Sequence, residues 1–135
     1  MPRKGKMYPL SREEREEVHE FIQEQLRKGY IRSSKSFQTA SVFFVEKKDG
    51  KKRMVQDYRY LNEWTIKNNY FLPLISNIVE NIGTKKVFTK IDLRWGYNNI
   101  QIKERDKWKT TFTIPEESFK PTVMIFGLTN SPATF

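Results

Sequence analysis

Apolar residues at helical spacing predict an amphipathic helix near the start of the chain. The stripe consists of Val18, Phe21, Ile22 and Leu26. Ser11 followed by Glu14 has the pattern of a capping box, and Gly29 is a natural residue just after a helix end. A single stripe of this kind is typical of a helix that packs one face against a sheet.

A second stripe predicts another amphipathic helix in the middle of the chain. It comprises Leu74, Ile75, Ile78, Val79 and Ile82, with Pro73 near its start and Gly83 at its end. Residues 57–64 are expected to form a short helical turn. Ser131 and Pro132 have the pattern of an N-cap and a first helical residue, so a helix begins just where the chain stops. We therefore expect the sequence to be truncated.

Segments rich in β-branched and aromatic residues predict the strands. Residues 39–47 and 51–55 are expected to pair as a hairpin around a two-residue turn, Asp49 and Gly50. Residues 86–92, 98–102 and 110–114 are further strand candidates, and residues 119–125 form a returning strand after a turn at 115–118. Helices mixed with antiparallel hairpins predict an α+β fold. We expect a disordered basic arm over residues 1–9 and one incomplete domain over 10–135.

The composition favours an open architecture, or a core that other sequence completes. Only 37% of the residues are hydrophobic and 30% are charged. The absence of cysteine excludes disulfides and thiolate metal sites, and a single histidine, His19, argues against zinc. The longest apolar runs have four residues, which excludes a membrane span, and no signal peptide is visible. An intracellular location, cytoplasmic or nuclear, is expected.

Positive charge is concentrated at the predicted hairpin. The net charge is +9, and five basic residues fall within seven positions: Lys47, Lys48, Lys51, Lys52 and Arg53. Like charges that face each other across a hairpin repel, and a bound polyanion such as nucleic acid would relieve that repulsion. A solvated tip that discourages edge aggregation explains the same lysines, so both interpretations stay open.

Asp92 is the residue with the most suggestive surroundings. It closes the predicted strand 86–92 and is followed by Trp95, Gly96 and Tyr97. A carboxylate beside a glycine and an aromatic suits a metal ion and a nucleotide, although a lone aspartate at a strand end is usually a turn or capping residue. Two-metal phosphoryl transfer needs carboxylates that hold cations about 4 Å apart, and no partner for Asp92 is evident. The pattern indicates part of a polymerase site.

Four ordered motifs resemble the reverse transcriptases of gypsy-type long-terminal-repeat retrotransposons and, more distantly, the retroviral enzymes. They are ASVFFVEKKDG at 40–50, RMVQDYRYLN at 53–62, FTKIDLRWGY at 88–97 and FGLTNSPATF at 126–135. The resemblance implies the fingers and the first part of the palm of a right-hand polymerase. It also implies that the loop carrying the other two catalytic aspartates would lie beyond Phe135.

The resemblance implies a role for each residue around the site. Asp92 would be the catalytic residue and the ligand of both Mg²⁺ ions, which are hard cations that take carboxylate and phosphate oxygens. Tyr97 would lie beneath the incoming sugar and exclude a 2′-hydroxyl. The backbone of Trp95 and Gly96 would approach the triphosphate of the deoxynucleotide (dNTP), where a small residue helps.

Further residues would contact the substrate and the template-primer. The resemblance implies that Lys47 and Arg53 contact the triphosphate, Lys as a point charge and Arg bidentately. Phe126 and Gly127 would help to form the floor of the nucleotide pocket. The remaining basic residues would follow template and primer phosphates without reading sequence: Lys48, Lys51, Lys52 and Arg94.

Three functions remain open for the chain. It departs from the family pattern at four positions: Gln56, Phe71, Glu117 and Ile125. The first hypothesis is a fragment of an RNA-directed DNA polymerase that does not polymerise alone, because two of the three catalytic aspartates are absent. The second is a catalytically dead nucleic-acid-binding remnant. The third is an interaction module in which the exposed surface of an incomplete palm binds a protein partner or self-associates.

Overall fold

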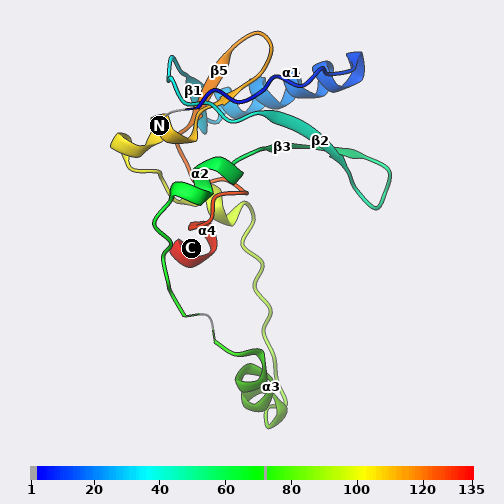
Figure 1. Cartoon of the computed structure of the whole chain (residues 1–135). Coiled ribbons are helices and arrows are strands. Elements are labelled where there is room, and N and C mark those ends of the chain that lie inside the picture. Colours follow the sequence, from blue (N-terminus) through cyan, green and yellow to red (C-terminus); the bar gives the residue numbers. More distant parts are fainter. Residues whose placement is uncertain (1–2, 72) are drawn as a thin grey trace.

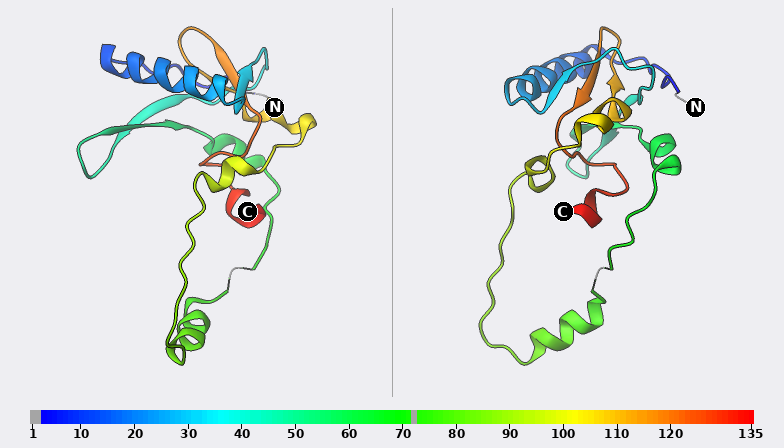
Figure 2. Two further views of the ribbon diagram at one scale, coloured as in Figure 1. Left: turned by 180° about the vertical axis from the view of Figure 1, so that it is seen from behind. Right: turned by 90° about the vertical axis from the view of Figure 1, so that its left-hand side faces the viewer.

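The structure, a computed structural model, describes residues 3–71 and 73–135. Figure 1 shows most helices and strands gathered in one body, with α3 (Ile75–Gly83) at the far end of a long arm. Figure 2 shows two extended stretches of chain running between that body and α3, one green and one yellow-green. The low apolar fraction thus corresponds to an open architecture, as the composition predicts.

Helix α1 (Arg12–Arg27) forms as the sequence predicts, and its capping box is complete. The Ser11 hydroxyl accepts a hydrogen bond from the Glu14 backbone N–H at 3.2 Å, and Glu14 Oε2 accepts one from the Ser11 N–H at 2.9 Å. Val18 and Ile22 are buried, so the predicted stripe faces the core. Gly29 follows the helix end with φ +71°, a conformation that favours glycine.

A three-stranded antiparallel sheet carries the core. It consists of β1 (Ile31–Ser33), β4 (Phe112–Thr113) and β5 (Ser118–Pro121), in the order β1-β5-β4. The core cluster comprises Leu10, Val18, Ile22, Ile31, Val42, Phe112, Ile114 and Phe119. Strand β1 was not predicted. Strand β5 ends at Pro121, short of the predicted residue 125, where its register with β1 ends at Ile31. The Thr122 N–H still donates to the Tyr30 carbonyl at 2.9 Å.

The predicted basic hairpin is present as β2 (Val42–Glu46) and β3 (Lys52–Gln56), but its predicted turn is wrong. Glu46 pairs with Lys52, and the Gly50 N–H donates to the Lys47 carbonyl at 3.0 Å. A type I′ turn needs positive φ at both central residues. Of the described non-glycine residues only Trp95 has positive φ, so Asp49 cannot supply one. The loop is therefore three residues, 48–50, with Gly50 at φ +77°.

The predicted strand at residues 86–92 is wrong. This segment is extended but pairs with no strand among the described residues, and Val87 and Ile91 are 87% and 79% exposed. An isolated strand leaves its backbone groups to water and has no partner to stabilise it. Helix α3 is confirmed, although its apolar residues are exposed. Within residues 3–71 and 73–135, no helix is long and apolar enough to cross a membrane.

Short helical turns complete the body. The predicted turn at 57–64 is confirmed as α2 (Arg59–Trp64). The predicted strand at 98–102 is wrong, because a 3₁₀ turn, η1 (Gly96–Asn99), leaves only a single bridge between Gln101 and Val123. A second 3₁₀ segment, η2 (Glu104–Thr110), precedes β4. Helix α4 (Ser131–Thr134) starts one residue before the prediction, with Asn130 rather than Ser131 as N-cap.

Part of the segment expected to be a disordered arm pairs with the body. The Thr39 N–H donates to the Arg3 carbonyl at 3.0 Å, and the Gly5 N–H donates to the Thr39 carbonyl at 2.7 Å. A Cβ at Gly5 would lie 2.5 Å from the Ser41 nitrogen, so glycine allows this close approach. Residues 1–2 lie outside the described residues, and the boundary between arm and domain stays a prediction.

Candidate functional site

Two separate parts of the predicted nucleotide pocket, Gly96-Tyr97 and Phe126, come together although they are far apart in sequence. The Tyr97 ring lies edge-on to Phe126 at 5.0 Å and to Phe135 at 5.5 Å between centroids. A Cβ at Gly96 would lie 2.8 Å from the Phe135 ring, so a larger residue there would displace the ring. We name Gly96, Tyr97, Phe126 and Phe135 the aromatic cluster. It joins the third motif to the fourth.

Trp95 turns the chain from the extended arm into the aromatic cluster. Its backbone is left-handed, with φ +56° and ψ +38°, and it immediately precedes η1. Such a conformation is uncommon for a bulky residue and needs surrounding support. The Lys28 Nζ lies 5.1 Å from the centroid of the Trp95 ring, a cation–π contact with the end of α1.

The loop after Phe126 is held by the side chain of Asn62. Gly127 has φ +94°, and a Cβ there would lie 3.5 Å from the buried Tyr58 ring. Asn62 Nδ2 donates to the Gly127 carbonyl at 2.7 Å, and the Thr129 N–H donates to Asn62 Oδ1 at 2.9 Å. Sequence reasoning assigned no role to Asn62. The signal available was that Asn62 closes the second family motif, at 53–62.

The second motif also anchors this region through an ion pair and a buried hydroxyl. Arg59 donates to both carboxylate oxygens of Asp57, at 2.8 and 2.7 Å, and these bonds lower the pKa of Asp57. The Tyr58 hydroxyl donates to the Thr110 carbonyl at 2.7 Å, and full burial raises the pKa of Tyr58. These contacts place α2 against η2 and beneath Gly127.

Asp92 lies apart from the body on the extended arm, and its side chain is exposed, as is that of Arg94. Throughout residues 3–71 and 73–135, no group of three or more His, Asp or Glu side chains could hold a metal ion. Among the described residues, Asp92 is therefore not part of any such group.

The basic hairpin presents its charge at a tip that stands apart from α4 and the aromatic cluster (Figures 1 and 2). Lys47, Lys48, Lys51 and Arg53 are exposed there. Lys52 is engaged: its Nζ lies 2.6 Å from Glu14 Oε1 at the start of α1. This hydrogen bond lowers the pKa of Glu14 and raises the pKa of Lys52.

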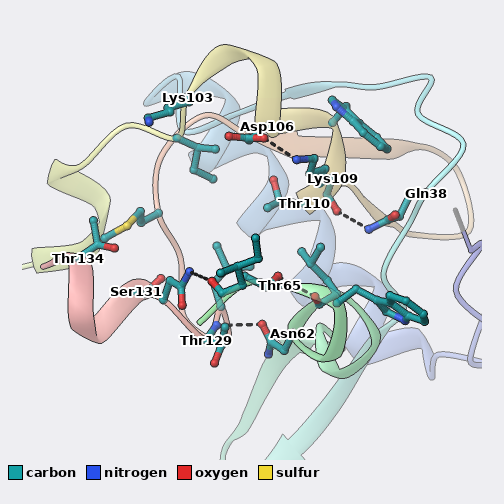
Figure 3. A pocket seen from close by; sticks show the side chains of 18 of the residues that line it. Gln38, Asn62, Thr65, Lys103, Asp106, Lys109, Thr110, Thr129, Ser131 and Thr134 are labelled. Atoms are coloured by element: carbon teal, nitrogen blue, oxygen red, sulfur yellow. Dashed lines mark hydrogen bonds and ion pairs between the residues drawn. The ribbon is translucent and has the colours of Figure 1, made fainter. Parts of the chain in front are cut away.

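A cavity of about 840 Å³ lies beside the loop that Asn62 holds. Figure 3 shows Asn62, Thr65, Thr110, Thr129 and Ser131 around it, contributed by α2, η2 and the chain near α4. None of the predicted site residues lines this cavity. The segment from residue 128 to residue 131, which follows Phe126 and Gly127 in the chain, lines this cavity.

The sequence is similar to a described family and to known transposon proteins. Residues 45–135 match the family model "Reverse transcriptase (RNA-dependent DNA polymerase)". The Tf2-3 and Tf2-7 transposon polyproteins of Schizosaccharomyces pombe are each 38% identical to this chain over 128 residues, which is 95% of its length. The chain spans only 10% of the length of either polyprotein.

Solved structures of foamy virus protease-reverse transcriptases are also similar. The enzyme in complex with dsDNA has a TM-score of 0.82 and 28% identity, and the match covers 100% of this chain and 28% of that one. The enzyme in complex with an RNA/DNA hybrid also has a TM-score of 0.82, with 26% identity over 98% of this chain and 18% of that one. Both complexes contain nucleic acid.

These matches agree with the motif order and with the fold. The chain has mixed helices and antiparallel strands, as in the fingers and palm region of those structures. The matching family polymerises DNA and generally uses a divalent metal ion. The chain belongs to the reverse transcriptase family, as a portion similar to the polyproteins of gypsy-type retrotransposons.

Proposed function

We propose that this chain forms the fingers and the first part of the palm of an RNA-directed DNA polymerase. The intact enzyme would transfer deoxynucleotides to a primer 3′-hydroxyl, and template-primer and dNTP would be its substrates. The observation that carries this proposal is the aromatic cluster, in which two distant family motifs meet at Gly96, Tyr97 and Phe126. The chain spans a small part of its relatives, so the complete activity belongs to a longer protein.

The aromatic cluster would receive the sugar and base of the nucleotide. Tyr97 is braced edge-on by Phe126 and Phe135, so its ring is held in one orientation, as a steric gate requires. Gly96 has no Cβ to displace the Phe135 ring, and Gly127 supplies backbone with no side chain. Trp95 would contribute backbone to the triphosphate from its left-handed turn.

The hairpin would supply positive charge to phosphates. Lys47 and Arg53 would contact the triphosphate, while Lys48 and Lys51 on the hairpin and Arg94 on the arm would follow template and primer phosphates. The separation of the hairpin tip from the aromatic cluster means that the two would have to approach each other during nucleotide binding. Lys52 would contribute to nucleic-acid binding only by exchanging its ion pair with Glu14 for a phosphate.

Asp92 would be one ligand of the catalytic Mg²⁺ ions. The carboxylate is the right donor for a hard cation, and its exposure leaves room for phosphate oxygens and water. A single carboxylate does not fit a two-metal site. When bound, the ions would neutralise charge on the transferring phosphoryl group, with further carboxylates supplied by the longer enzyme.

Nucleotide binding by the chain tests the pocket assignment. Saturation-transfer NMR with dTTP and Mg²⁺ should detect binding, and Tyr97→Ala should weaken it by roughly fivefold through lost aromatic contact. Tyr70→Ala is the matched control, because Tyr70 is 68% exposed on the arm. If dTTP fails to bind, or if Tyr97→Ala binds as the unsubstituted chain does, the pocket assignment is wrong.

A second candidate function is nucleic-acid binding without catalysis. The concentration of exposed basic side chains on the hairpin favours it, and it needs neither a nucleotide pocket nor a metal. It predicts binding that depends on salt and tolerates any sequence. Duplex binding without dTTP binding would favour this function over the polymerase fragment.

A further inference from the structure

We propose that Asn62 and Asn130 are positioning residues that hold the loop at residues 126–129 in place and thereby set the floor of the nucleotide pocket. We name this pair of side chains the amide clamp. The proposal concerns the loop itself. Its consequence for nucleotide binding rests on the proposed function of the aromatic cluster.

The first half of the clamp is the Asn62 side-chain amide, which bonds to one backbone carbonyl and one backbone N–H of the loop. Asn62 Nδ2 donates to the Gly127 carbonyl, and Asn62 Oδ1 accepts from the Thr129 N–H, which Figure 3 shows as a dashed line. The donor–acceptor distances are 2.7 and 2.9 Å. The two partners fix the orientation of the amide, because only its NH₂ group can donate to a carbonyl. Asn62 thus pairs with the loop as a neighbouring strand would.

In the second half, the side chain of Asn130, just after the loop, bonds to the backbone that follows α2. Asn130 Nδ2 donates to the Ile66 carbonyl at 2.8 Å, and Asn130 Oδ1 accepts from the Asn68 N–H at 3.0 Å. An asparagine N-cap usually accepts from its own helix. Asn130 is the N-cap of α4, yet its side chain makes no capping bond and bonds to residues 66 and 68 instead. Each segment therefore offers an amide to the backbone of the other.

Burial holds only the second half of the loop, where Leu128 and Thr129 are half-buried. Phe126 is 75% exposed, and Gly127 is exposed at φ +94°. An exposed loop with a glycine has many alternative conformations and little apolar surface to select one. Besides the amide clamp, Ser131 Oγ donates to the Ile125 carbonyl at 3.2 Å, just before the loop. These hydrogen bonds fix the position of the loop, and the edge contact between Phe126 and Tyr97 depends on that position.

The clamp lies outside the core, so its loss should affect position rather than folding. The core cluster around Phe112 and Phe119 is formed by α1, β1, β2, β4 and β5, and neither asparagine belongs to it. Both asparagines are half-buried, where a hydrogen bond contributes modestly to global stability. A residue of this kind can be tested by a local readout that global unfolding would not mimic.

Amide exchange measured by NMR tests the clamp in the chain itself. Asn62→Ala should speed exchange of the Thr129 N–H by roughly tenfold and weaken the nuclear Overhauser effect between the Tyr97 and Phe126 rings. Asn62→Asp keeps an acceptor for the Thr129 N–H but loses the donor to Gly127, so it should retain the Thr129 protection. Asn130→Ala should speed exchange at Asn68. The control is Asn81→Ala, an exposed amide on α3.

The outcomes separate the clamp from the proposed function. Unchanged Thr129 exchange in Asn62→Ala overturns the clamp, and so does equal loss of protection at Phe119, which would mean general unfolding. Asn62→Ala should also weaken dTTP binding by roughly tenfold while duplex binding persists. Unchanged dTTP affinity in that variant overturns the positioning role. If the unsubstituted chain binds no dTTP, the pocket function fails, and exchange alone decides the clamp.

Discussion

Tyr58 shows how one buried hydroxyl joins segments that are far apart in the chain. It lies in the second family motif, its ring supports Gly127, and its hydroxyl bonds to the Thr110 carbonyl at the end of η2. Asn62, four residues later, holds the opposite side of the same loop. The side chains of Tyr58 and Asn62, both in the second motif, thus hold the loop of the candidate site in place and are not themselves part of the site.

We expect Tyr58→Phe to destabilise the chain by about 1–2 kcal/mol, because the Thr110 carbonyl would lose its buried donor. Urea unfolding followed by circular dichroism measures this change. Tyr70→Phe is the control, since Tyr70 is exposed and should leave the free energy of unfolding unchanged. Equal stability of Tyr58→Phe and the unsubstituted chain would contradict the supporting role.

The ion pair between Glu14 and Lys52 predicts a pH dependence. The pKa of Glu14 is lowered below 4.5 in the folded chain, mainly by its bond to Lys52. Its stabilising contribution is therefore present above 4.5 and is lost as the pH falls through the lowered value. The pKa of Lys52 is raised above 10.5, so the contribution is also lost as the pH rises through that raised value.

The urea midpoint of the unsubstituted chain should fall as the pH drops below 4.5, the ordinary pKa of a glutamate. Glu14→Gln should make this fall smaller. Glu17→Gln, an exposed position on the same helix, should keep the full fall. Measuring urea midpoints across the acid range for both variants checks this. A parallel pH profile for Glu14→Gln and the unsubstituted chain would rule out the linkage.

Among the elements, the β2–β3 hairpin and the arm carry the features that the body does not explain. The hairpin places like charges side by side at an exposed tip, which is unfavourable without an anion. Lys52 opposes Glu46 in the last pair before the loop, so its ion pair with Glu14 ties the loop end of the hairpin to the start of α1. The loop lysines beyond this pair, Lys47, Lys48 and Lys51, are exposed and available to phosphates.

Replacing Lys47, Lys48, Lys51 and Arg53 by glutamine should weaken duplex binding and flatten its salt dependence. Each lost phosphate contact lowers the slope of log affinity against log salt by about 0.9. Filter binding over a salt series measures this slope. The charge-matched control replaces Lys67, Lys85, Lys86 and Lys90, which are exposed on the arm. Equal slopes for the two variants would locate the binding surface elsewhere.

The molecule taken together is a packed body with an unpartnered arm. The arm exposes the apolar face of α3 and an extended segment that carries Asp92. Exposed apolar surface and unpaired backbone favour association with another chain or another part of a longer protein. The same arrangement leaves Asp92 outside any cluster of three or more His, Asp or Glu side chains among the described residues.

We predict that the purified chain does not extend a primer, because one carboxylate cannot hold two cations close together. Incubation with template-primer, Mg²⁺ and dNTPs followed by gel electrophoresis checks this. The control is a complete reverse transcriptase under the same conditions. Primer extension by the chain that Asp92→Asn abolishes would overturn the prediction.

We also predict self-association that depends on the arm. Light scattering should show oligomers that grow with concentration, and Ile75→Lys with Val79→Lys should shift the chain toward the monomer. Both side chains are exposed, at 79% and 61%, so the substitutions should not disturb the core. Substituting the exposed Glu80 by lysine is a control for added charge alone. A monomeric unsubstituted chain would refute this prediction.

The features that could be predicted from the sequence are those with local causes. A capping box, an apolar stripe and a following glycine suffice to specify α1, because each acts within a few residues. The hairpin and its charge were also predictable, and the order of four motifs identified the family. Its turn was predicted one residue too short, because Asp49-Gly50 suits a two-residue loop as well as a three-residue one.

The remaining features depend on long-range contacts. Residues 86–92 have the composition of a strand, but a strand forms only where another strand offers hydrogen bonds. The meeting of Tyr97 with Phe126 and the amide clamp of Asn62 and Asn130 join residues that sequence spacing does not relate. The chain therefore encodes its family, its first helix and its basic hairpin locally. The exposure of Asp92 and the shape of the candidate pocket follow from which segments find partners in three dimensions.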